Sequence, residues 1–229
     1  MKDLTDITFI LDRSGSMQDL KSDVIGGFAQ FVEEQQKVGG NAVLSLVQFD
    51  DQYESVFSSM PIANVSPKLN FQPRGMTALR DAVGRTVNAI GNRLANLPES
   101  ERPSKVIIAI FTDGYENASH EFSQQQIKDM IEHQQGKYQW KFLFLGANID
   151  SFAAAQSYGI SSLTMTNYKP SSLGMRSAIG AMCSYTSSVR SGATPQALNA
   201  IYQKTEDELA NNVTITSGSS GSSGTASSK

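Results

Sequence analysis

Apolar runs alternate along the chain with segments of helical spacing. Residues 7–11, 42–49, 105–112 and 140–145 are nearly continuous apolar runs between polar boundaries, a pattern typical of strands buried on both faces. After the first run, Leu20, Val24, Phe28 and Phe31 recur every three or four positions, which predicts a helix with one buried face. This order predicts a doubly wound α/β fold, with a mostly parallel central sheet and helices on both faces.

One strand is expected to run against the others. Residues 53–60 follow the short polar turn 50–52 and alternate between apolar and polar, which predicts an antiparallel hairpin at one edge of the sheet. Later in the chain, Ser123 and Gln126 have the spacing of a capping box at a helix start. We further expect a short strand at 163–165 and helices at 171–189 and 195–211.

Composition divides the chain into three parts. Of its 229 residues, 39% are hydrophobic and 18% charged, which suits one α/β domain with a substantial core. We place this domain at residues 1–192 and a more polar helical extension at 193–213. Residues 214–229 are rich in Ser and Gly, and we expect them to form a flexible tail because they offer little apolar surface to bury.

Charge and cysteine content narrow the function. The formal net charge is -3 and no basic run with interleaved aromatic residues occurs, which argues against binding to nucleic acid or an anionic membrane. Residues 1–6 include two acids and are followed by an apolar run too short for a signal peptide, so we expect none, and the sequence contains no apolar stretch of about 20 residues. Cys183 is the only cysteine, so an internal disulfide is excluded, as expected in a reducing compartment. We therefore expect a cytoplasmic protein.

Oxygen-bearing side chains stand where predicted strands and helices meet. Asp12, Ser14 and Ser16 follow the first strand, Thr77 precedes a helix, and Asp113 follows the third long apolar run. Each motif by itself is compatible with an ordinary turn or helix cap. If both strands are central and parallel, however, these loops converge at the carboxyl edge of the sheet. A divalent cation would then remove the repulsion between the two carboxylates, and Mg²⁺ prefers such oxygen ligands.

Three stretches resemble the metal-ion-dependent adhesion site (MIDAS) of von Willebrand factor A (vWA) domains: Asp12-Arg13-Ser14-Gly15-Ser16, Gly75-Met76-Thr77 and Thr112-Asp113-Gly114. All five metal-site positions match in type and order, and the resemblance covers about residues 3–189. The chain is similar to the small intracellular members of this family that occur in bacteria and phages.

The resemblance implies a ligand set and a partner. Ser14, Ser16 and Thr77 or Asp113 would contact Mg²⁺, or alternatively Mn²⁺, and the remaining carboxylates would act through water. It further implies a protein partner whose Asp or Glu completes the coordination. In this family such partners include AAA+ ATPases and multiprotein assemblies.

An enzyme is the competing interpretation. A phosphotransfer domain of the haloacid-dehalogenase or receiver type also places a strand-end Asp on Mg²⁺, but it needs a second acid nearby and a lysine that reaches the phosphoryl group. Ser14 replaces that acid, and Lys105 begins its strand rather than ending it. No phosphate-binding loop or serine-hydrolase motif occurs either. We therefore expect a binding module and not an enzyme.

The remaining polar residues near these motifs are given ordinary structural roles. His120 and His133, the only histidines, fall in polar segments expected to be helical and exposed. Four further residues are expected to be turn residues or solvated loop residues: Asp50, Asp51, Glu116 and Asn117.

Overall fold

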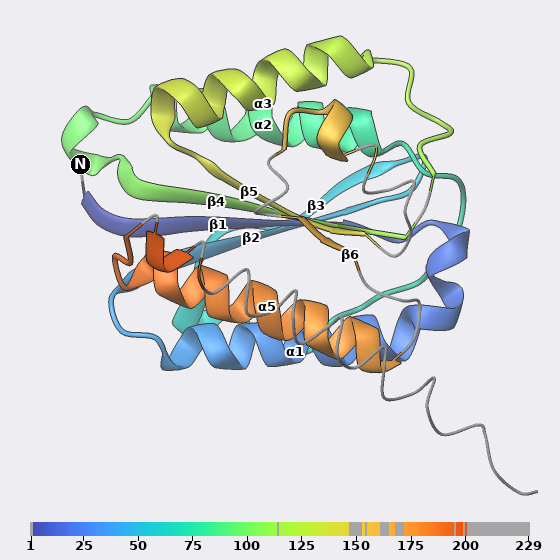
Figure 1. Ribbon diagram of the computed structural model, residues 1–229, viewed down its shortest axis with the longest axis horizontal. Coiled ribbons are helices and arrows are strands. Elements are labelled where there is room, and N and C mark those ends of the chain that lie inside the picture. Colours follow the sequence, from blue (N-terminus) through green and yellow to red (C-terminus); the bar gives the residue numbers. More distant parts are fainter. Residues whose placement is uncertain are drawn as a thin grey trace, which may run out of the picture.

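Six strands form one sheet in the part of the chain that the computed structural model describes, in the order β3-β2-β1-β4-β5-β6 (Figure 1). The described residues are 2–113, 115–146, 153, 155–160, 165–167, 172–194, 196–198 and 200. The strands are β1 (Lys2–Asp12), β2 (Asn41–Phe49), β3 (Tyr53–Pro61), β4 (Pro103–Thr112), β5 (Lys141–Gly146) and β6 (Met165–Asn167). The helices are α1 (Lys21–Lys37), α2 (Leu79–Ala95), α3 (Gln124–Tyr138) and α5 (Ser172–Arg190), with 3₁₀ segments η1 (Gly15–Leu20), η2 (Ile62–Asn64) and η3 (Glu99–Glu101).

The strand pairing confirms the predicted doubly wound sheet. β1 pairs in parallel with both β2 and β4, and β4, β5 and β6 continue in parallel. Only β3 runs antiparallel, against β2, as the alternating pattern of residues 53–60 predicted. Because the chain leaves β1 toward β2 and later crosses to β4 on the other side, the strand order reverses between β1 and β4. Ligands bind at such a switch point, beyond the carboxyl ends of the strands.

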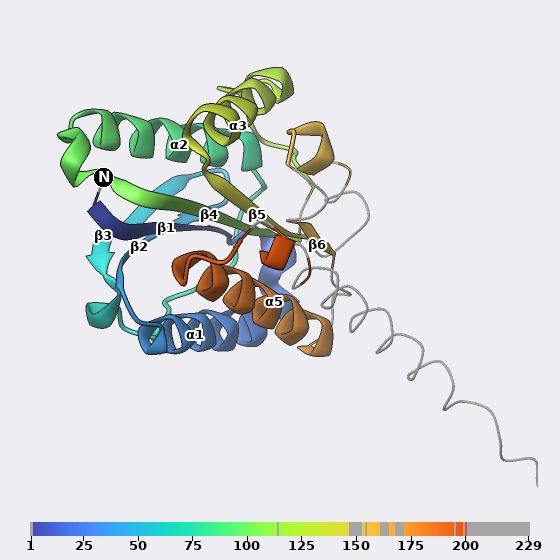
Figure 2. The same ribbon diagram turned by 60° about the vertical axis from the view of Figure 1, so that its left-hand side comes forward.

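Two hydrophobic layers hold helices against opposite faces of the sheet. Phe9 and Leu11 of β1 pack with residues of α1 and α5, whereas Ile10 packs with residues of α2 and α3. Figures 1 and 2 show the same arrangement, with α1 and α5 below the sheet and α2 and α3 above it. Burying a large apolar side chain stabilises a fold by roughly 1.5–3 kcal/mol, so these layers fix the strands, and with them the loops at the strand ends.

Local signals were confirmed in part. The capping box exists, because Ser123 Oγ accepts from the backbone N–H of Gln126 and the Gln126 side chain accepts in return. The helix predicted from the spacing of Leu20, Val24, Phe28 and Phe31 begins at Lys21, and Leu20 lies in the 3₁₀ segment η1 that precedes it. Most of the connection between β1 and α1, at the switch point, is therefore a 3₁₀ helix.

The C-terminal predictions lie partly outside the described residues. The predicted helix at 171–189 is α5, and the predicted short strand is β6, shifted toward Asn167. Residues 163–164 and 201–229 fall outside the described part, so most of the predicted 195–211 helix and the predicted 214–229 tail do as well. The domain boundaries at 192 and 213 stay predictions. Among the described residues, no helix has the length and apolar character needed to cross a bilayer.

Candidate metal centre

Asp12 occupies the end of β1 and is completely buried. Its Oδ1 accepts a hydrogen bond of 2.7 Å from the backbone N–H of Ser14, and its Oδ2 accepts one of 2.6 Å from the Thr112 hydroxyl at the end of β4. The two central strands are therefore joined at their carboxyl ends through this carboxylate. The structure therefore shows that the loop after β1 and the loop after β4 lie next to each other, as predicted.

Hydroxyl groups extend the cluster from Asp12 toward Asp113. Ser14 Oγ lies 3.1 Å from Ser16 Oγ, and Ser16 Oγ donates to Asp113 Oδ1 at 2.8 Å. Ser14 occupies the N-cap position of η1 but its side chain makes no capping hydrogen bond. The hydroxyls therefore do not serve as helix caps, and they lie next to each other and to a carboxylate.

Backbone hydrogen bonds attach the Thr77 loop to the loop after β1. Gly15 N–H donates to the Gly75 carbonyl at 3.2 Å, and Arg74 N–H donates to the Arg13 carbonyl at 2.8 Å. Gly75 has φ +68°, and a Cβ at this position would lie 2.2 Å from Asp51 Oδ1. The left-handed backbone conformation therefore favours glycine here, whereas the exposed Asp51 carboxylate could move away from a Cβ.

Thr77 itself is buried and is not the cap of α2. The N-cap is Ala78, with no side-chain capping bond, which removes the alternative role that the sequence left open for Thr77. Instead, Thr77 N–H donates to Asn117 Oδ1 at 2.9 Å, and the Thr77 carbonyl accepts from Asn117 and Ala118 N–H at 3.0 and 3.2 Å. The second and third loops are thus fastened together around Thr77.

Glu116 and Asn117 lie in a loop, as expected, and Asn117 is exposed whereas Glu116 is partly buried. Both side chains also make bonds that the sequence did not predict: Asn117 accepts from the Thr77 backbone N–H at 2.9 Å, and Glu116 accepts from Arg80 N–H at 2.9 Å and from the Ser119 hydroxyl at 2.7 Å. Both side chains satisfy backbone donors that α2 and its approach leave unpaired. Nothing in the local sequence signalled this, because the donors come from a segment about 40 residues earlier.

Asp50 is the residue whose importance the sequence concealed. It lies in the expected turn after β2, but its side chain is fully buried and its Oδ2 accepts from Arg13 Nε at 3.1 Å and from Arg74 Nε at 2.8 Å. Each arginine belongs to a different metal-site loop. Arg13 also pairs with Glu54 of β3. Asp50 therefore connects the loop after β1 to the loop that contains Thr77. Asp51 is exposed, as expected.

The pKa values of Asp50 and Asp12 shift in opposite directions. Burial favours a raised pKa of Asp50, but hydrogen bonds from Arg74 and Gln52 and the charge of Arg13 outweigh it and lower that pKa. Burial, with a smaller contribution from the charge of Asp113, raises the pKa of Asp12 to about 6 against the hydrogen bonds of Thr112 and Ser14. A carboxylate in such a position gains from an added cation.

The pKa of Asp113 is raised as well. Burial raises its pKa, the hydrogen bond from Ser16 opposes this, and the charge of Asp19 adds to the increase. Two carboxylates and neighbouring hydroxyls make an all-oxygen donor set, which suits a hard divalent cation. The residues that would hold such an ion are Asp12, Ser14, Ser16, Thr77 and Asp113. Hydrogen bonds link four of them directly, and Thr77 is brought to them by its backbone.

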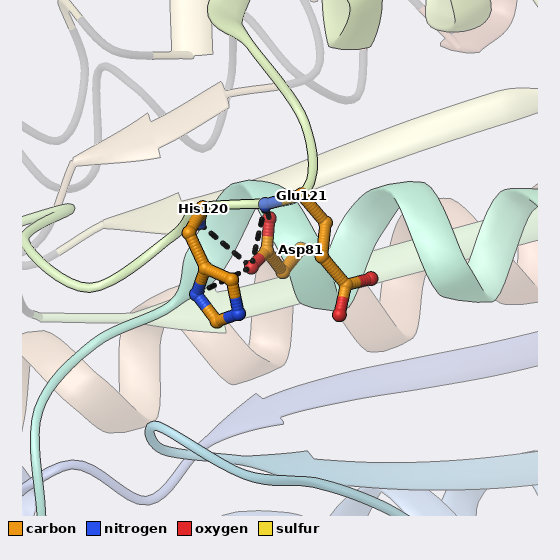
Figure 3. A group of neighbouring side chains, drawn as sticks. All are labelled: Asp81, His120 and Glu121. Atoms are coloured by element: carbon orange, nitrogen blue, oxygen red, sulfur yellow. Dashed lines mark hydrogen bonds and ion pairs between the residues drawn. The ribbon is translucent and has the colours of Figure 1, made fainter.

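A second group of acidic and imidazole side chains lies on the α2 side of this region. Asp81, His120 and Glu121 each place a ligand-type atom within 4.8 Å of the others (Figure 3). The Asp81 carboxylate already accepts from the backbone N–H groups of His120, Glu121 and Phe122 at 2.9–3.2 Å, and Glu121 pairs with Arg85. These bonds attach the loop before α3 to α2. His120 lies in that loop and not in a helix.

Two other side chains singled out in the sequence have structural positions. His133 lies within α3 and its ring meets that of Tyr138 at 5.7 Å between centroids. Cys183 is buried in α5, and burial raises the pKa of its thiol to about 12. A thiol with that pKa remains protonated at neutral pH and is a poor nucleophile.

Comparison with known proteins gives no sequence match but clear matches of fold. No protein-family model matches the chain, and no curated protein sequence does. Mussel byssus proximal thread matrix protein 1, in a structure with a zinc-occupied MIDAS motif, matches with a TM-score of 0.56 and 18% identity over 78% of this chain and 46% of its own. A von Willebrand factor type A protein from Catenulispora acidiphila matches with a TM-score of 0.55 and 12% identity over 80% of this chain and 42% of its own.

A third match is the pilus adhesin SpaC from Lactobacillus rhamnosus GG in its open conformation, with a TM-score of 0.57 and 15% identity over 79% of this chain and 29% of the adhesin. At these identities the comparison establishes the fold, and the chain has the Rossmann-like α/β fold of vWA domains. It spans less than half of the length of each of these three proteins.

Proposed function

We propose that this chain is a metal-ion-dependent protein-interaction module. In this proposal, Asp12, Ser14, Ser16, Thr77 and Asp113 hold one divalent cation, Mg²⁺ or Mn²⁺, and an Asp or Glu of a partner protein completes the coordination. The observation that carries the proposal is the hydrogen-bonded series from Thr112 through Asp12, Ser14 and Ser16 to Asp113 at the switch point.

Chemistry supports binding more than turnover. A cation held largely by neutral hydroxyls keeps most of its charge, and it therefore attracts an incoming carboxylate. The chain's own residues fix the loops: Asp50 joins Arg13 to Arg74, and Asn117 holds Thr77. Among the solved structures of the same fold, one has zinc in its MIDAS motif and another is a pilus adhesin, which is consistent with metal-dependent adhesion.

The burial of Asp12 argues against phosphotransfer. A nucleophilic aspartate needs a carboxylate oxygen that a phosphoryl group can approach, whereas Asp12 is fully buried and both of its oxygens accept hydrogen bonds. For the same reason, Asp12 would hold the proposed cation through water and through its bond to Ser14, and not by direct contact. We therefore propose that the protein has no phosphatase or ATPase activity of its own. Turnover of p-nitrophenyl phosphate or ATP that disappears in Asp12→Asn would restore the enzyme interpretation.

Metal binding is tested by calorimetry with MnCl₂ and MgCl₂. The wild type and Glu121→Gln are expected to bind one ion, because Glu121 belongs to the other acidic group, whereas Asp12→Ala is expected to lose binding. Since a ligand that binds only the folded state stabilises it, EDTA should lower the melting temperature of wild type loaded with metal. Equal binding by wild type and Asp12→Ala would refute the assignment.

Partner binding is tested by affinity capture with and without EDTA, using wild type and Thr77→Ala. The Thr77 hydroxyl is a proposed metal ligand, so its loss should weaken capture. Because Thr77 does not cap α2, the melting temperature of the metal-free protein should stay nearly unchanged. A partner of the AAA+ class, or an assembly in the cytoplasm, is the form of partner we propose. Capture that persists undiminished for a folded Thr77→Ala in EDTA would mean that the partner binds elsewhere.

A further inference from the structure

Large hydrophobic side chains are exposed next to the candidate metal centre. In the described part of the chain, four such side chains are more than a third exposed: Val56 (43%), Met76 (55%), Tyr115 (61%) and Tyr138 (52%). Single exposed hydrophobic residues are common and need no explanation. Here, however, Met76 directly precedes Thr77 and Tyr115 follows Asp113 by two positions, so two of the four belong to the metal-site loops.

Met76 and Tyr115 belong to two neighbouring loops. Thr77, next to Met76, exchanges hydrogen bonds with Asn117, two positions after Tyr115, at 2.9 and 3.0 Å. The two loops therefore run beside each other at the carboxyl edge of the sheet. The other two exposed residues are placed differently: Val56 is on the edge strand β3, and Tyr138 ends α3 just before the amino end of β5.

The backbone holds Met76 in its exposed position. Gly75, before it, accepts from Gly15 N–H, and Thr77, after it, is buried and hydrogen-bonded on both its N–H and its carbonyl. Because both neighbours are hydrogen-bonded, the backbone at Met76 is held at the loop surface. Tyr115 is likewise followed by Glu116, which accepts from Arg80 N–H at the start of α2. Met and Tyr are enriched where proteins meet.

The loops around the apolar pair carry charges of both signs. Arg74, whose side chain is 56% exposed, precedes Gly75 and Met76 and pairs with Asp50, and the charges of Glu54 and Asp51 also act on it. The charge of Asp19 acts on Asp113. A preference for an acidic occupant therefore comes from the proposed metal ion and not from the surrounding side chains.

We propose that Met76 and Tyr115 form, together with the metal centre, a docking surface for a protein segment whose carboxylate is flanked by apolar side chains. This inference rests on the proposed function, because the carboxylate is the group that would meet the metal ion. The apolar neighbours of that carboxylate would cover Met76 and Tyr115. Selectivity among acidic segments would then come from these two residues, and the metal centre alone would not distinguish them.

The test uses the full chain and three fluorescent peptides of equal length. The first has the central sequence Phe-Asp-Leu, the second Ser-Asp-Ser and the third Phe-Asn-Leu, all in Gly-Ser flanks. Binding is followed by fluorescence polarisation in MnCl₂ and in EDTA, for wild type, Met76→Ser/Tyr115→Ser, and the matched control Val56→Ser/Tyr138→Ser. Manganese affinity of each variant is measured separately by calorimetry, and its fold by circular dichroism.

Wild type in MnCl₂ is expected to bind the Phe-Asp-Leu peptide roughly tenfold more tightly than Ser-Asp-Ser, a typical effect of a few buried interface side chains. Met76→Ser/Tyr115→Ser should lose this preference while keeping its manganese affinity, and the control pair should keep both. EDTA and the Phe-Asn-Leu peptide should each abolish binding.

Two outcomes separate this inference from the proposed function. If both acidic peptides bind equally and only with MnCl₂, the proposed function stands and the apolar docking surface is wrong. If no peptide binds in a metal-dependent way, both are wrong. Sedimentation is measured on the same samples, and a wild-type dimer that the Met76→Ser/Tyr115→Ser change dissociates would mean that a second copy of this chain covers the surface.

Discussion

The hydroxyl of Thr112 donates a hydrogen bond to Oδ2 of Asp12 at 2.6 Å, across 100 residues of sequence. We expect Thr112→Val to lower the free energy of unfolding of the metal-free protein by about 1.5–3 kcal/mol, since a buried carboxylate would lose a donor. The pKa of Asp12 should rise further, because this hydrogen bond lowers it. Urea unfolding in EDTA measures the loss. Thr112→Ser keeps the hydroxyl and should cost much less; equal losses in both variants would point to packing instead.

Asp50 is expected to matter far more than its neighbour Asp51. Asp50→Asn removes the buried charged partner of Arg13 and leaves that guanidinium only its pair with the half-exposed Glu54, and breaking a buried pair costs about 3–5 kcal/mol. We expect the lower end here, because the Arg74 side chain is 56% exposed and its ion pair is screened. Manganese affinity should fall too, since the two metal-site loops lose their common support. Asp51→Asn, an exposed carboxylate one position later, is the matched control and should change neither quantity.

Gly75→Ala is expected to damage the metal centre through the backbone. The residue has φ +68°, a conformation that costs a residue with a Cβ roughly 1–2 kcal/mol, so stability should fall by about that amount. The hydrogen bond from Gly15 to Gly75 should weaken, and manganese affinity with it. Gly91→Ala in α2 meets nothing within 4 Å and should stabilise the protein by about 0.5–1 kcal/mol. Thermal melting and calorimetry on both variants decide the comparison.

Asp6 should make stability depend on pH in the direction opposite to a surface acid. It is buried on β1, Oδ2 accepts from Arg93 at 2.7 Å, and Oδ1 has no hydrogen-bond partner among the described residues. Burial raises its pKa more than the charge and hydrogen bond of Arg93 lower it. The folded state therefore holds a proton that the unfolded chain releases above about pH 4. This stabilisation is complete below that pH and is lost as pH rises through the raised pKa.

Asp6→Asn should remove this part of the pH dependence. We expect the wild-type stability minus the variant stability to decrease as pH rises from about 4 toward neutrality. Urea unfolding in EDTA at several pH values gives the difference. Asp3→Asn, which removes an exposed carboxylate from the same strand, is the control for the loss of one negative charge. A flat difference for Asp6→Asn would mean that its carboxyl is not perturbed by burial.

The sequence by itself determined the layered fold, because local patterns carried it. Near-continuous apolar runs marked β1, β2, β4 and β5, and the alternating run at 53–60 marked the antiparallel β3. These patterns follow from burial on one or both faces of a strand, which each segment records in its own residues. The candidate site could also be listed in advance, since Asp12, Ser14, Ser16, Thr77 and Asp113 follow or precede those segments.

What only the tertiary structure decided is which groups meet. That β1 and β4 are neighbours, so that Thr112 reaches Asp12, is a matter of strand order, which no local pattern records. Asp50 looked like Asp51, because a turn accepts either; its role comes from Arg13 and Arg74, which are 37 and 24 positions away. Asn117 likewise depends on the backbone of Thr77. A hydrogen bond is decided by distance in space, and that distance exists only after both hydrophobic layers have packed.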